Sequence, residues 1–585
     1  MKTQRTIPLI LVCVFCWSSF VNQASSQEFE TPAEATDFQA GPTMYGPMME
    51  FLEQLQTKSS LLNIRKLTST LRGRDVVLCV MSDPPVYRPA DVINSDKPIV
   101  LIVSNVHGAE VAGKDATLML VRDLVVGELK SLLKETVVLV VPNINPDGTE
   151  ARRRTNEEGF DLNRDYLKLE SQEIRALVTQ VINKWQPDLH VDTHNGGSAP
   201  YTLVYQTNMN PAGDKELMWL GNEVVLPRIR EALREEDYDG FWYSGPRSIG
   251  GVPGWAPTSV EARKQHVYST LANMLGFLFE TPSGTHRVIE NGTKVVPIPS
   301  RERYRHQVRG QYIGQREVVR FAADQPEMLR RTVLNAKRRA TELGHDDSDD
   351  DQVILSYRQV AKYMDSFWIR NRNRQEGQDA YTLVNQPVFT QFVPIETTTR
   401  PWGYILPPQL ASVVPLLLDH EITVKRIEEP ITVEVESYMA NSVRNTQYYQ
   451  GHYLKSVDVD KVTRERSFPS GSFFVPSGQP KSNLISYLLE PQTDDNLVTW
   501  EFLNRFVRLR DRPAPPEDSE AEDGSANEQG AEGGEAAGNR RRRGGRQRSQ
   551  RGQQLIPIHR VMKQTTFQST LVDVFNDSQR NRYVR

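Results

Sequence analysis

In the first third of the chain, continuous hydrophobic runs alternate with runs of helical spacing. Residues 98–103 (PIVLIV) and 136–142 (TVVLVVP) are apolar runs of strand length, typical of strands buried on both faces of a parallel sheet. Between them, residues 111–124 carry apolar side chains at helical spacing. Strand, helix and strand in this order predict an α/β fold with a mixed, largely parallel central sheet flanked by helices.

The same patterns predict further elements on both sides of this unit. Residues 202–269 are expected to be rich in loops, with an irregular segment at 245–255 that forms the wall of a pocket. The other expected elements are helices at 46–55, 170–185 and 316–343, a hairpin of strands 62–71 and 74–81 turning at Arg72-Gly73, and strands at 187–194 and 271–279.

Composition changes sharply in the second half of the chain. Short strand patterns and turns predict a β-rich C-terminal accessory domain at 352–511, after a solvated acidic linker at 346–351. Residues 512–554 are of low complexity, acidic first and then Arg-rich, and are predicted to be a disordered segment because they cannot bury a core. Residues 555–585 are expected to dock on the accessory domain.

The N-terminus has the pattern of an export signal. Lys2 and Arg5 precede an apolar run, and small residues follow at 24–26, so residues 1–26 are predicted to be a secretory signal peptide. An uncleaved N-terminal anchor is the alternative. With cleavage, the protein is expected to be secreted or periplasmic, with no integral membrane span, and to retain Cys79 as its one thiol.

Composition and charge exclude some classes of partner. A hydrophobic content of 38% with 25% charged residues is that of a soluble globular protein. The formal net charge of −4 gives no reason to expect nucleic acid as the main partner. These values leave an enzyme or a binding protein as the classes to distinguish.

A histidine and a carboxylate lie where the first predicted strand gives way to its helix. His107 and Glu110 are three residues apart at the carboxyl end of that strand, the usual position of chemistry in an open α/β sheet. Nitrogen and oxygen ligands suit zinc. Taken alone, the motif is better explained by a surface histidine and a glutamate favoured by the helix dipole.

Later strands and loops carry more candidates in a suggestive order. Three arginines at 152–154 precede Asn163 and Arg164, a set able to bind a carboxylate, although a solvated basic loop is the alternative. Alternation places His190, Asp192 and His194 on one strand face, and His194 is nearest the strand end. We expect His190 to be an ordinary packed histidine, and Asp192 to orient a ligand or cap the turn.

A glutamate ends another apolar strand. Glu280 follows the run 271–279, a setting that raises the pKa of a carboxylate and suits a general base. An acid that simply reaches solvent at a strand end is the alternative.

In this order, His107-x-x-Glu110, Arg154, Asn163-Arg164, His194 and Glu280 resemble the zinc carboxypeptidase family (carboxypeptidase A-like metallocarboxypeptidases) over about residues 40–345. The local sequences Asn145-Pro-Asp-Gly148 and Asp161-Leu-Asn-Arg164 strengthen the resemblance. It implies one zinc ion per chain and a catalytic domain at 27–345 of zinc-carboxypeptidase-like fold.

The resemblance also implies a role for each residue. His107, Glu110 and His194 would be the metal ligands, and Asp161 the partner of His107 behind them. Glu280 would be the general base and Arg154 the group that stabilises the oxyanion, while Asn163 and Arg164 would bind the substrate's terminal carboxylate.

The sequence departs from the family at two places. The family has Ser-x-Tyr-like residues after the third ligand, whereas Asn195-Gly196-Gly197 follow here. For the tyrosine that covers the substrate, Tyr268 and Tyr243 are the candidates.

We therefore expect an exported zinc metallocarboxypeptidase that hydrolyses a C-terminal peptide bond of a peptide or peptide-like substrate with a free carboxylate. The alternatives are a related amidase or carboxypeptidase acting on cell-wall peptides, and a zinc-retaining binding protein without catalysis. Glu280 and Arg154 argue against the last, because binding alone needs neither.

Overall fold

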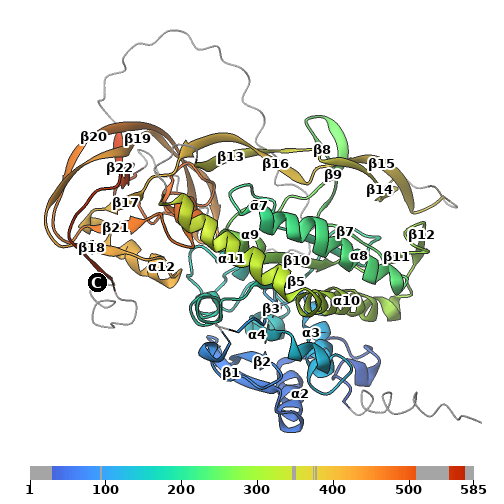
Figure 1. Ribbon diagram of the computed structural model, residues 1–585. Helices are drawn as coiled ribbons and strands as arrows, with labels where there is room; N and C mark the ends of the chain where they lie inside the picture. Colours follow the sequence, from blue (N-terminus) through green and yellow to red (C-terminus); the bar gives the residue numbers. More distant parts are fainter. Residues whose placement is uncertain are drawn as a thin grey trace, which may run out of the picture.

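The centre of the molecule is an eight-stranded mixed sheet flanked by helices (Figure 1). The computed structural model describes residues 29–92, 95–345, 351–372, 375, 378–508 and 553–572. The strand order is β1-β2-β4-β3-β5-β10-β6-β7. Its strands are β1 (Leu62–Ser69), β2 (Asp75–Met81), β3 (Ile99–Ser104), β4 (Val137–Val141), β5 (Leu189–Asn195), β6 (Leu203–Thr207), β7 (Gly240–Trp242) and β10 (Leu275–Thr281).

The four middle strands of this sheet are parallel. β3 pairs in parallel with both β4 and β5, and β5 pairs in parallel with β10. β2 pairs antiparallel with β4 and β1, and β6 pairs antiparallel with β10 and in parallel with the edge strand β7. The predicted α/β fold with a mixed central sheet is confirmed, and the carboxyl ends of β3, β5 and β10 meet at one edge.

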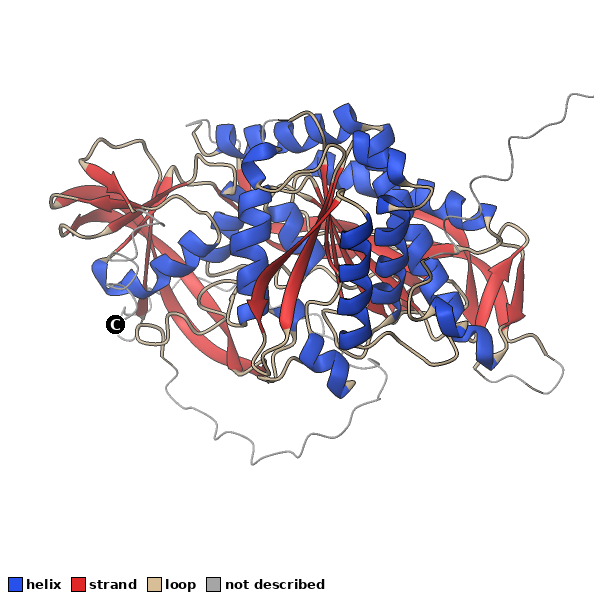
Figure 2. Cartoon of the chain, turned by 90° about the horizontal axis from the view of Figure 1, so that it is seen from below, coloured by secondary structure: helices blue, strands red, loops and turns tan. Residues whose placement is uncertain are grey.

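Alternating side chains of the strands divide the core into two layers. On β3, Val100 and Ile102 belong to one hydrophobic cluster, while Ile99, Leu101 and Val103 belong to the other. Burial on both faces explains why the strand is apolar throughout. Figure 2 shows the strands running between helices. The first face packs against α2 (Tyr45–Lys58), α3 (Ala112–Val125), α8 (Leu226–Glu235), α10 (Arg303–Asp324) and α11 (Pro326–Leu343), and the second against α5 (Gln172–Ala176), η5 (Leu177–Ile182), α6 (Asn183–Trp185) and α9 (Gln265–Leu271).

Two predicted segments have a different secondary structure in the protein. The helix expected at 316–343 is two helices, because Pro326 lacks an N–H and disfavours helical geometry at Gln325, whose φ and ψ are −128° and 46°. The segment expected to be irregular at 245–255 is a hairpin of β8 (Gly245–Ile249) and β9 (Val252–Ala256). Its turn is Gly250-Gly251, both with positive φ, as two-residue hairpin turns require.

The strand expected at 271–279 and the loops expected at 202–269 are also revised. α9 extends through Leu271, and the strand β10 begins four residues later, so Glu280 lies within it. The region before α9 includes α7 (Lys215–Trp219), the π-helical turn η6 (Leu220–Val225) and α8. Smaller elements are η1 (Glu34–Thr36), η2 (Pro89–Asp91), η3 (Lys130–Lys134), α4 (Pro146–Ala151), η4 (Leu162–Arg164), β11 (His286–Ile289), β12 (Lys294–Pro297) and η7 (Ser300–Glu302).

The C-terminal half is rich in β-structure, as predicted, but not purely β. A seven-stranded sheet with the order β20-β19-β22-β17-β21-β18-β23 lies at one end of the molecule (Figure 1). Its strands are β17 (Gly403–Leu406), β18 (Lys425–Ile427), β19 (Ile431–Tyr449), β20 (His452–Phe468), β21 (Phe473–Pro476), β22 (Gln554–Val561) and β23 (Ser569–Leu571). It is accompanied by η8 (Pro408–Val413), α12 (Val414–Asp419) and α13 (Ser482–Leu489).

The C-terminal half is built onto the central α/β unit. β13 (Gln352–Val360) pairs with β16 (Gln391–Thr399), and β14 (Tyr363–Arg370) pairs with β15 (Tyr381–Val388). β15 also pairs in parallel with β9 of the central unit, where Val388 lies opposite Trp255. The hydrophobic cluster on the second face of the central sheet also contains Leu417 and Ile556 of the C-terminal half. A shared core of this kind fixes the two parts relative to each other.

Arg508 and Gln554 lie at the two ends of the low-complexity segment and are hydrogen-bonded to each other. The backbone N–H of Arg508 donates to Oε1 of Gln554 at 2.8 Å, and Nε2 of Gln554 donates to the carbonyl of Arg508 at 2.8 Å. The chain therefore leaves the folded part and rejoins it at one point. The predicted signal peptide at 1–26 and almost all of the low-complexity segment lie outside the described residues. Among the residues that are described, none of the helices is long and apolar enough to cross a membrane.

Candidate metal centre and active site

Two imidazoles and a carboxylate meet at the carboxyl edge of the sheet. Nδ1 of His107 lies 3.0 Å from Nδ1 of His194, and these atoms lie 2.9 Å and 2.8 Å from the two oxygens of Glu110. The three residues offer ligand atoms within 4.8 Å of one another, as a shared metal ion requires. The residues that the sequence singled out are thus brought together from places 87 positions apart in the chain.

A tight loop after β3 aims His107 and Glu110. Asn105 adopts a left-handed conformation (φ 59°), and its amide donates to the carbonyl of Gly108 at 3.2 Å and to Thr149 Oγ1 at 2.8 Å. At Gly108, a Cβ would lie 2.1 Å from the backbone carbon of Gly148, so only glycine allows this approach. The loop therefore packs backbone to backbone against α4.

His194 lies on β5, beside Glu280 of β10 in the parallel register. The next residue, Asn195, donates its backbone N–H to Oε2 of Glu110 at 3.1 Å. Its side-chain Oδ1 accepts from the N–H of Ala112 at the start of α3, at 3.1 Å. The end of β5 is in this way tied to the loop that holds the other two residues.

A carboxylate lies behind each imidazole. Nε2 of His107 is 3.0 Å from Oδ1 of Asp161, and Nε2 of His194 is 2.7 Å from Oδ2 of Asp192. Because an ionised carboxylate only accepts, each Nε2 carries the proton and each Nδ1 presents a lone pair to the other. Two facing lone pairs repel each other unless a proton or a cation lies between them. The nitrogen and oxygen donors, with carboxylates behind the imidazoles, fit a zinc ion.

The charges of the cluster shift its pKa values. Burial opposes ionisation of Glu110 and Asp161, but His107 and the neighbouring groups hold the pKa of both carboxylates well below their usual range. Burial also opposes protonation of His194, but Asp192 and Glu110 raise the pKa of that imidazole. Both carboxylates therefore stay ionised, with Glu110 facing the shared position and Asp161 behind His107.

Glu280 lies beside the cluster in a confined space. Burial, together with the charge of Glu110, raises the pKa of Glu280 to about 7 even though His194 opposes this. A Cβ added to Gly196 would lie 2.1 Å from Oε2 of Glu280. The glycine at position 196 therefore leaves the space that this carboxylate occupies.

Of the three neighbouring arginines, Arg154 is the one beside the cluster. Its Nε donates to Oδ2 of Asp161 at 2.9 Å, and Nη1 lies 3.3 Å from Oε1 of Glu110, while the side chain remains 41% exposed. Arg153 instead pairs with Glu157, and Arg152 is exposed. Arg154 therefore presents a partly accessible positive charge at the mouth of the site.

Asn163 and Arg164 lie on η4, which Asp161 caps by accepting from the N–H of Asn163 at 3.0 Å. The amide nitrogen of Asn163 is 3.0 Å from Nε2 of His194, and its oxygen accepts from the N–H of Gln265 at 2.9 Å. Asn163 is thus buried against the cluster. Arg164 is partly buried, and its Nε donates to the hydroxyl of Tyr449 at 2.6 Å.

The structure does not bring Tyr268 to the site. Its side chain is fully buried, and its hydroxyl lies 3.0 Å from Nδ1 of His420 in the C-terminal half. Such an enclosed side chain cannot cover a substrate. Tyr243, the other candidate, is partly buried after β7. His190 is a packed histidine, as expected, with Nδ1 3.0 Å from Ser269 Oγ, and burial lowers its pKa to about 3.

Sequence reasoning missed several residues that build the site. Asn145 caps α4 and also donates to the carbonyls of Val106 and Arg154, both at 3.2 Å, thereby linking the His107 loop to the arginine. The sequence Asn145-Pro-Asp-Gly148 indicated a turn and strengthened the family resemblance, but it gave Asn145 no role of its own. Tyr449 comes from the C-terminal half, where nothing in the local pattern signals a role in this site.

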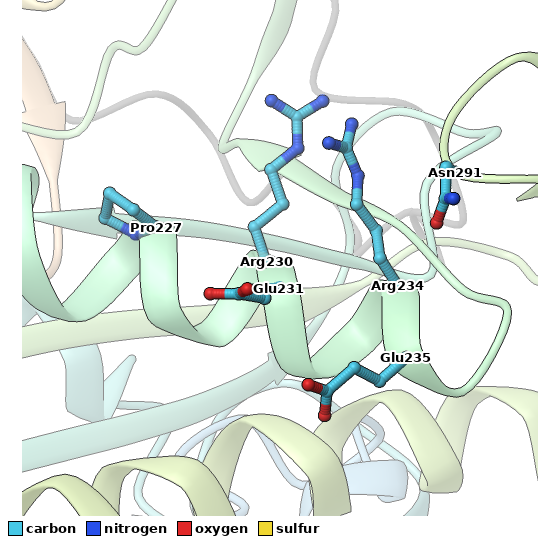
Figure 3. A pocket seen from close by; sticks show the side chains of 6 residues that line it. All are labelled: Pro227, Arg230, Glu231, Arg234, Glu235 and Asn291. Carbon is cyan, nitrogen blue, oxygen red and sulfur yellow. The ribbon is translucent and has the colours of Figure 1, made fainter.

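The surface hollow in Figure 3 is a separate feature. It is lined by Pro227, Arg230, Glu231, Arg234, Glu235 and Asn291, mostly from α8. Both of its arginines donate to Asp239, so their charges are already paired. None of the residues of the cluster described above lines it.

Comparison with known proteins agrees with this geometry. The family model described as zinc carboxypeptidase matches residues 48–287, which include every residue of the cluster and Glu280. Residues 48–287 form a zinc carboxypeptidase domain. The chain thus contains a metallocarboxypeptidase-type hydrolase unit, and the C-terminal half lies outside the matched residues.

Relatives of this carboxypeptidase domain extend the match. Carboxypeptidase 2 of Trichophyton tonsurans is 23% identical over 495 residues, covering 80% of this chain and 86% of that protein. Carboxypeptidase D of Homo sapiens is 26% identical over 190 residues, covering 30% of this chain and 13% of that protein. The first of these similarities reaches beyond residue 287, since it covers more of the chain than the domain does.

Solved structures also resemble parts of the chain. A metallo-carboxypeptidase from Burkholderia cenocepacia is 18% identical with a TM-score of 0.35, covering 48% of this chain and 70% of that one. The carboxypeptidase A from Helicoverpa armigera is 15% identical with a TM-score of 0.36, covering 49% of this chain and 75% of that one.

Proposed function

We propose that this protein is an exported zinc-dependent carboxypeptidase that hydrolyses the last peptide bond of substrates with a free C-terminal carboxylate. The observation that carries the proposal is the meeting of His107, Glu110 and His194, with Glu280 beside them. A zinc ion held by these three residues would polarise the scissile carbonyl and lower the pKa of a water molecule in the site. We expect about one zinc ion per chain.

The protein's own side chains supply the rest of the chemistry. Glu280 accepts a proton from the attacking water and returns one to the leaving amine, a role suited to a carboxylate with a pKa near neutrality. Arg154 aims its partly exposed guanidinium at the oxyanion that develops on the former carbonyl oxygen. Asp161 and Asp192 hold the two imidazoles in the tautomer that faces inward.

Asn163 and Arg164 are the residues that recognise the C-terminal end of the substrate. The guanidinium of Arg164 binds the terminal carboxylate, since its planar donors match two oxygens. Asn163 is adjacent in the sequence and is buried against His194. Export rests on Lys2, Arg5 and the apolar run after them.

The proposal is tested with peptide pairs that differ only at the C-terminus. A peptide library with free carboxylates, incubated with the zinc-loaded protein, should lose one C-terminal residue at a time by mass spectrometry. The same peptides as C-terminal amides should be far poorer substrates, and a chelator should stop the reaction. Cleavage of both forms at equal rates would point to a different amidase, and no cleavage of either would favour the non-catalytic alternative.

Arg164→Ala should raise KM selectively. Loss of a charged hydrogen-bonding pair with the carboxylate corresponds to a KM increase of about 10- to 100-fold, with a smaller effect on kcat. Steady-state kinetics on one free-carboxylate peptide provides the measurement. The matched control is Arg153→Ala, which removes an arginine paired with Glu157 on a neighbouring loop and should leave KM unchanged. An equal effect of the two substitutions would remove Arg164 from the substrate site.

A further inference from the structure

The longest hairpin of the C-terminal half ends against the carboxypeptidase domain. In β19–β20, Tyr449 pairs with His452, and Gln450 and Gly451 form the two-residue turn with φ values of 51° and 80°. Positive φ at both turn residues is the geometry that matches the twist of the two strands. The position of the tip is therefore set by the hairpin itself.

This tip contacts the segment that carries the predicted substrate residues. Oε1 of Gln450 accepts from the backbone N–H of Asp161 at 2.9 Å, and the hydroxyl of Tyr449 accepts from Nε of Arg164 at 2.6 Å. Nε2 of His452 lies 2.8 Å from Oε1 of Glu170. Asp161 in turn contacts His107 and Arg154, so the hairpin tip is one residue removed from the metal cluster.

The ring of Tyr449 is itself held in place. The guanidinium of Arg263 lies over it at 5.4 Å, and the ring of Trp500 is 6.5 Å away. Arg263 is fixed by an ion pair with Asp495 at 3.0 Å. Tyr449 therefore presents its hydroxyl to Arg164 from a rigid support rather than from a free loop.

The contact uses the inner donors of Arg164. Nε donates to Tyr449, and Nη1 donates to the carbonyl of Asn163 at 3.1 Å. Within the part of the chain that the structure describes, Nη2 of Arg164 has no hydrogen-bond partner. The two fixed donors set the plane and direction of the guanidinium, and a free edge remains for an anion.

From these contacts we propose that Tyr449 is a positioning residue for Arg164, so that the C-terminal half takes part in recognising the substrate's terminal carboxylate. This inference rests on the proposed function, in which Arg164 binds that carboxylate. A bidentate interaction depends on the orientation of the guanidinium. Without the hydroxyl, Arg164 samples other rotamers and must be ordered when the substrate binds, which weakens binding.

The decisive variant is Tyr449→Phe, which keeps the ring beside Arg263 and Trp500 and removes only the acceptor. We expect KM for a free-carboxylate peptide to rise about tenfold, with kcat changed less than twofold. The control is Tyr448→Phe on the same hairpin, whose side chain is 55% exposed and packs on Tyr453. It should match the wild-type protein in both constants.

A second measurement separates positioning from general loss of structure. In the Arg164→Ala background, Tyr449→Phe should cause no further rise in KM, because the residue acts through the guanidinium. Peptide affinity is measured by calorimetry on the zinc-loaded Glu280→Gln protein, which gives the same comparison without turnover. A tenfold weaker Kd for the free-carboxylate peptide in Tyr449→Phe, absent for its amide, is the expected result.

Three outcomes would overturn the inference. If Tyr449→Phe binds and cleaves like Tyr448→Phe while Arg164→Ala raises KM, the proposed function stands and the role of Tyr449 is refuted. If Arg164→Ala leaves both KM and Kd unchanged, the proposed carboxylate site fails, and the role of Tyr449 fails with it. An equal loss for the free-carboxylate peptide and its amide would show that Tyr449 acts only on the general structure of the site.

Discussion

Glu280→Gln is expected to abolish turnover while leaving metal binding intact. Glutamine has nearly the same shape, so the space beside Gly196 stays filled, but its amide cannot accept the proton of the attacking water. Loss of a general base corresponds to a fall in kcat of about 10²- to 10⁴-fold. Steady-state kinetics gives kcat, and elemental analysis of the same sample should still show about one zinc ion per chain.

Glu173→Gln is the matched control for this substitution. Burial also raises the pKa of Glu173 to about 7, and its Oε2 accepts at 3.2 Å from Asn156, a residue outside the metal cluster. We expect it to keep full activity. Unchanged kcat in Glu280→Gln would remove the base from the mechanism, and a loss of zinc in that variant would place Glu280 among the ligands instead.

His194→Ala is expected to lose the metal and, with it, activity. The side chain supplies one of the two nitrogens facing the shared position, and its removal also leaves Asp192 without its partner. Substitution of a residue that hydrogen-bonds to a metal ligand typically lowers metal affinity by about 10- to 100-fold. Loss of the ligand His194 itself should lower the affinity by more than that. Zinc content after dialysis and competition with a chelator measure the effect.

His190→Ala provides the comparison on the same strand. His190 is fully buried four residues before His194, and its Nδ1 faces Ser269 rather than the cluster. The variant should be less stable in thermal unfolding but should retain zinc. Retention of zinc by His194→Ala, with loss in His190→Ala, would show that the other histidine is the ligand.

Much of the site was predictable because its residues occupy strand ends. His107 and Glu110 follow a continuous apolar run, and position at the end of its strand distinguishes His194 from His190 on the same face. These signals are local, and the carboxyl ends of parallel strands must meet at one edge of the sheet. The role of Arg154 was predictable only through the resemblance to a family, since spacing alone does not separate it from Arg152 and Arg153.

Other features depend on contacts that no local pattern contains. Tyr449 reaches Arg164 across 285 positions, and the pattern of its strand indicates only a hairpin. Tyr268 is at helical spacing in an apolar stretch and proves to be core. The β8–β9 hairpin did have a local signal, Gly250-Gly251, but the surrounding residues show no clear strand pattern. The break before Pro326 was signalled by the proline itself, although the helical pattern continues across it.

The reciprocal hydrogen bonds between Arg508 and Gln554 have a consequence for how this sequence can vary. Arg508 and Gln554 are hydrogen-bonded to each other, so the chain leaves and re-enters the fold at a single point. The number of residues between these two positions therefore does not affect how β22 pairs in its sheet. Closing a longer excursion costs only about 0.6 kcal/mol for each doubling of its length. Connecting segments of different lengths between Arg508 and Gln554 are therefore compatible with the same strand order.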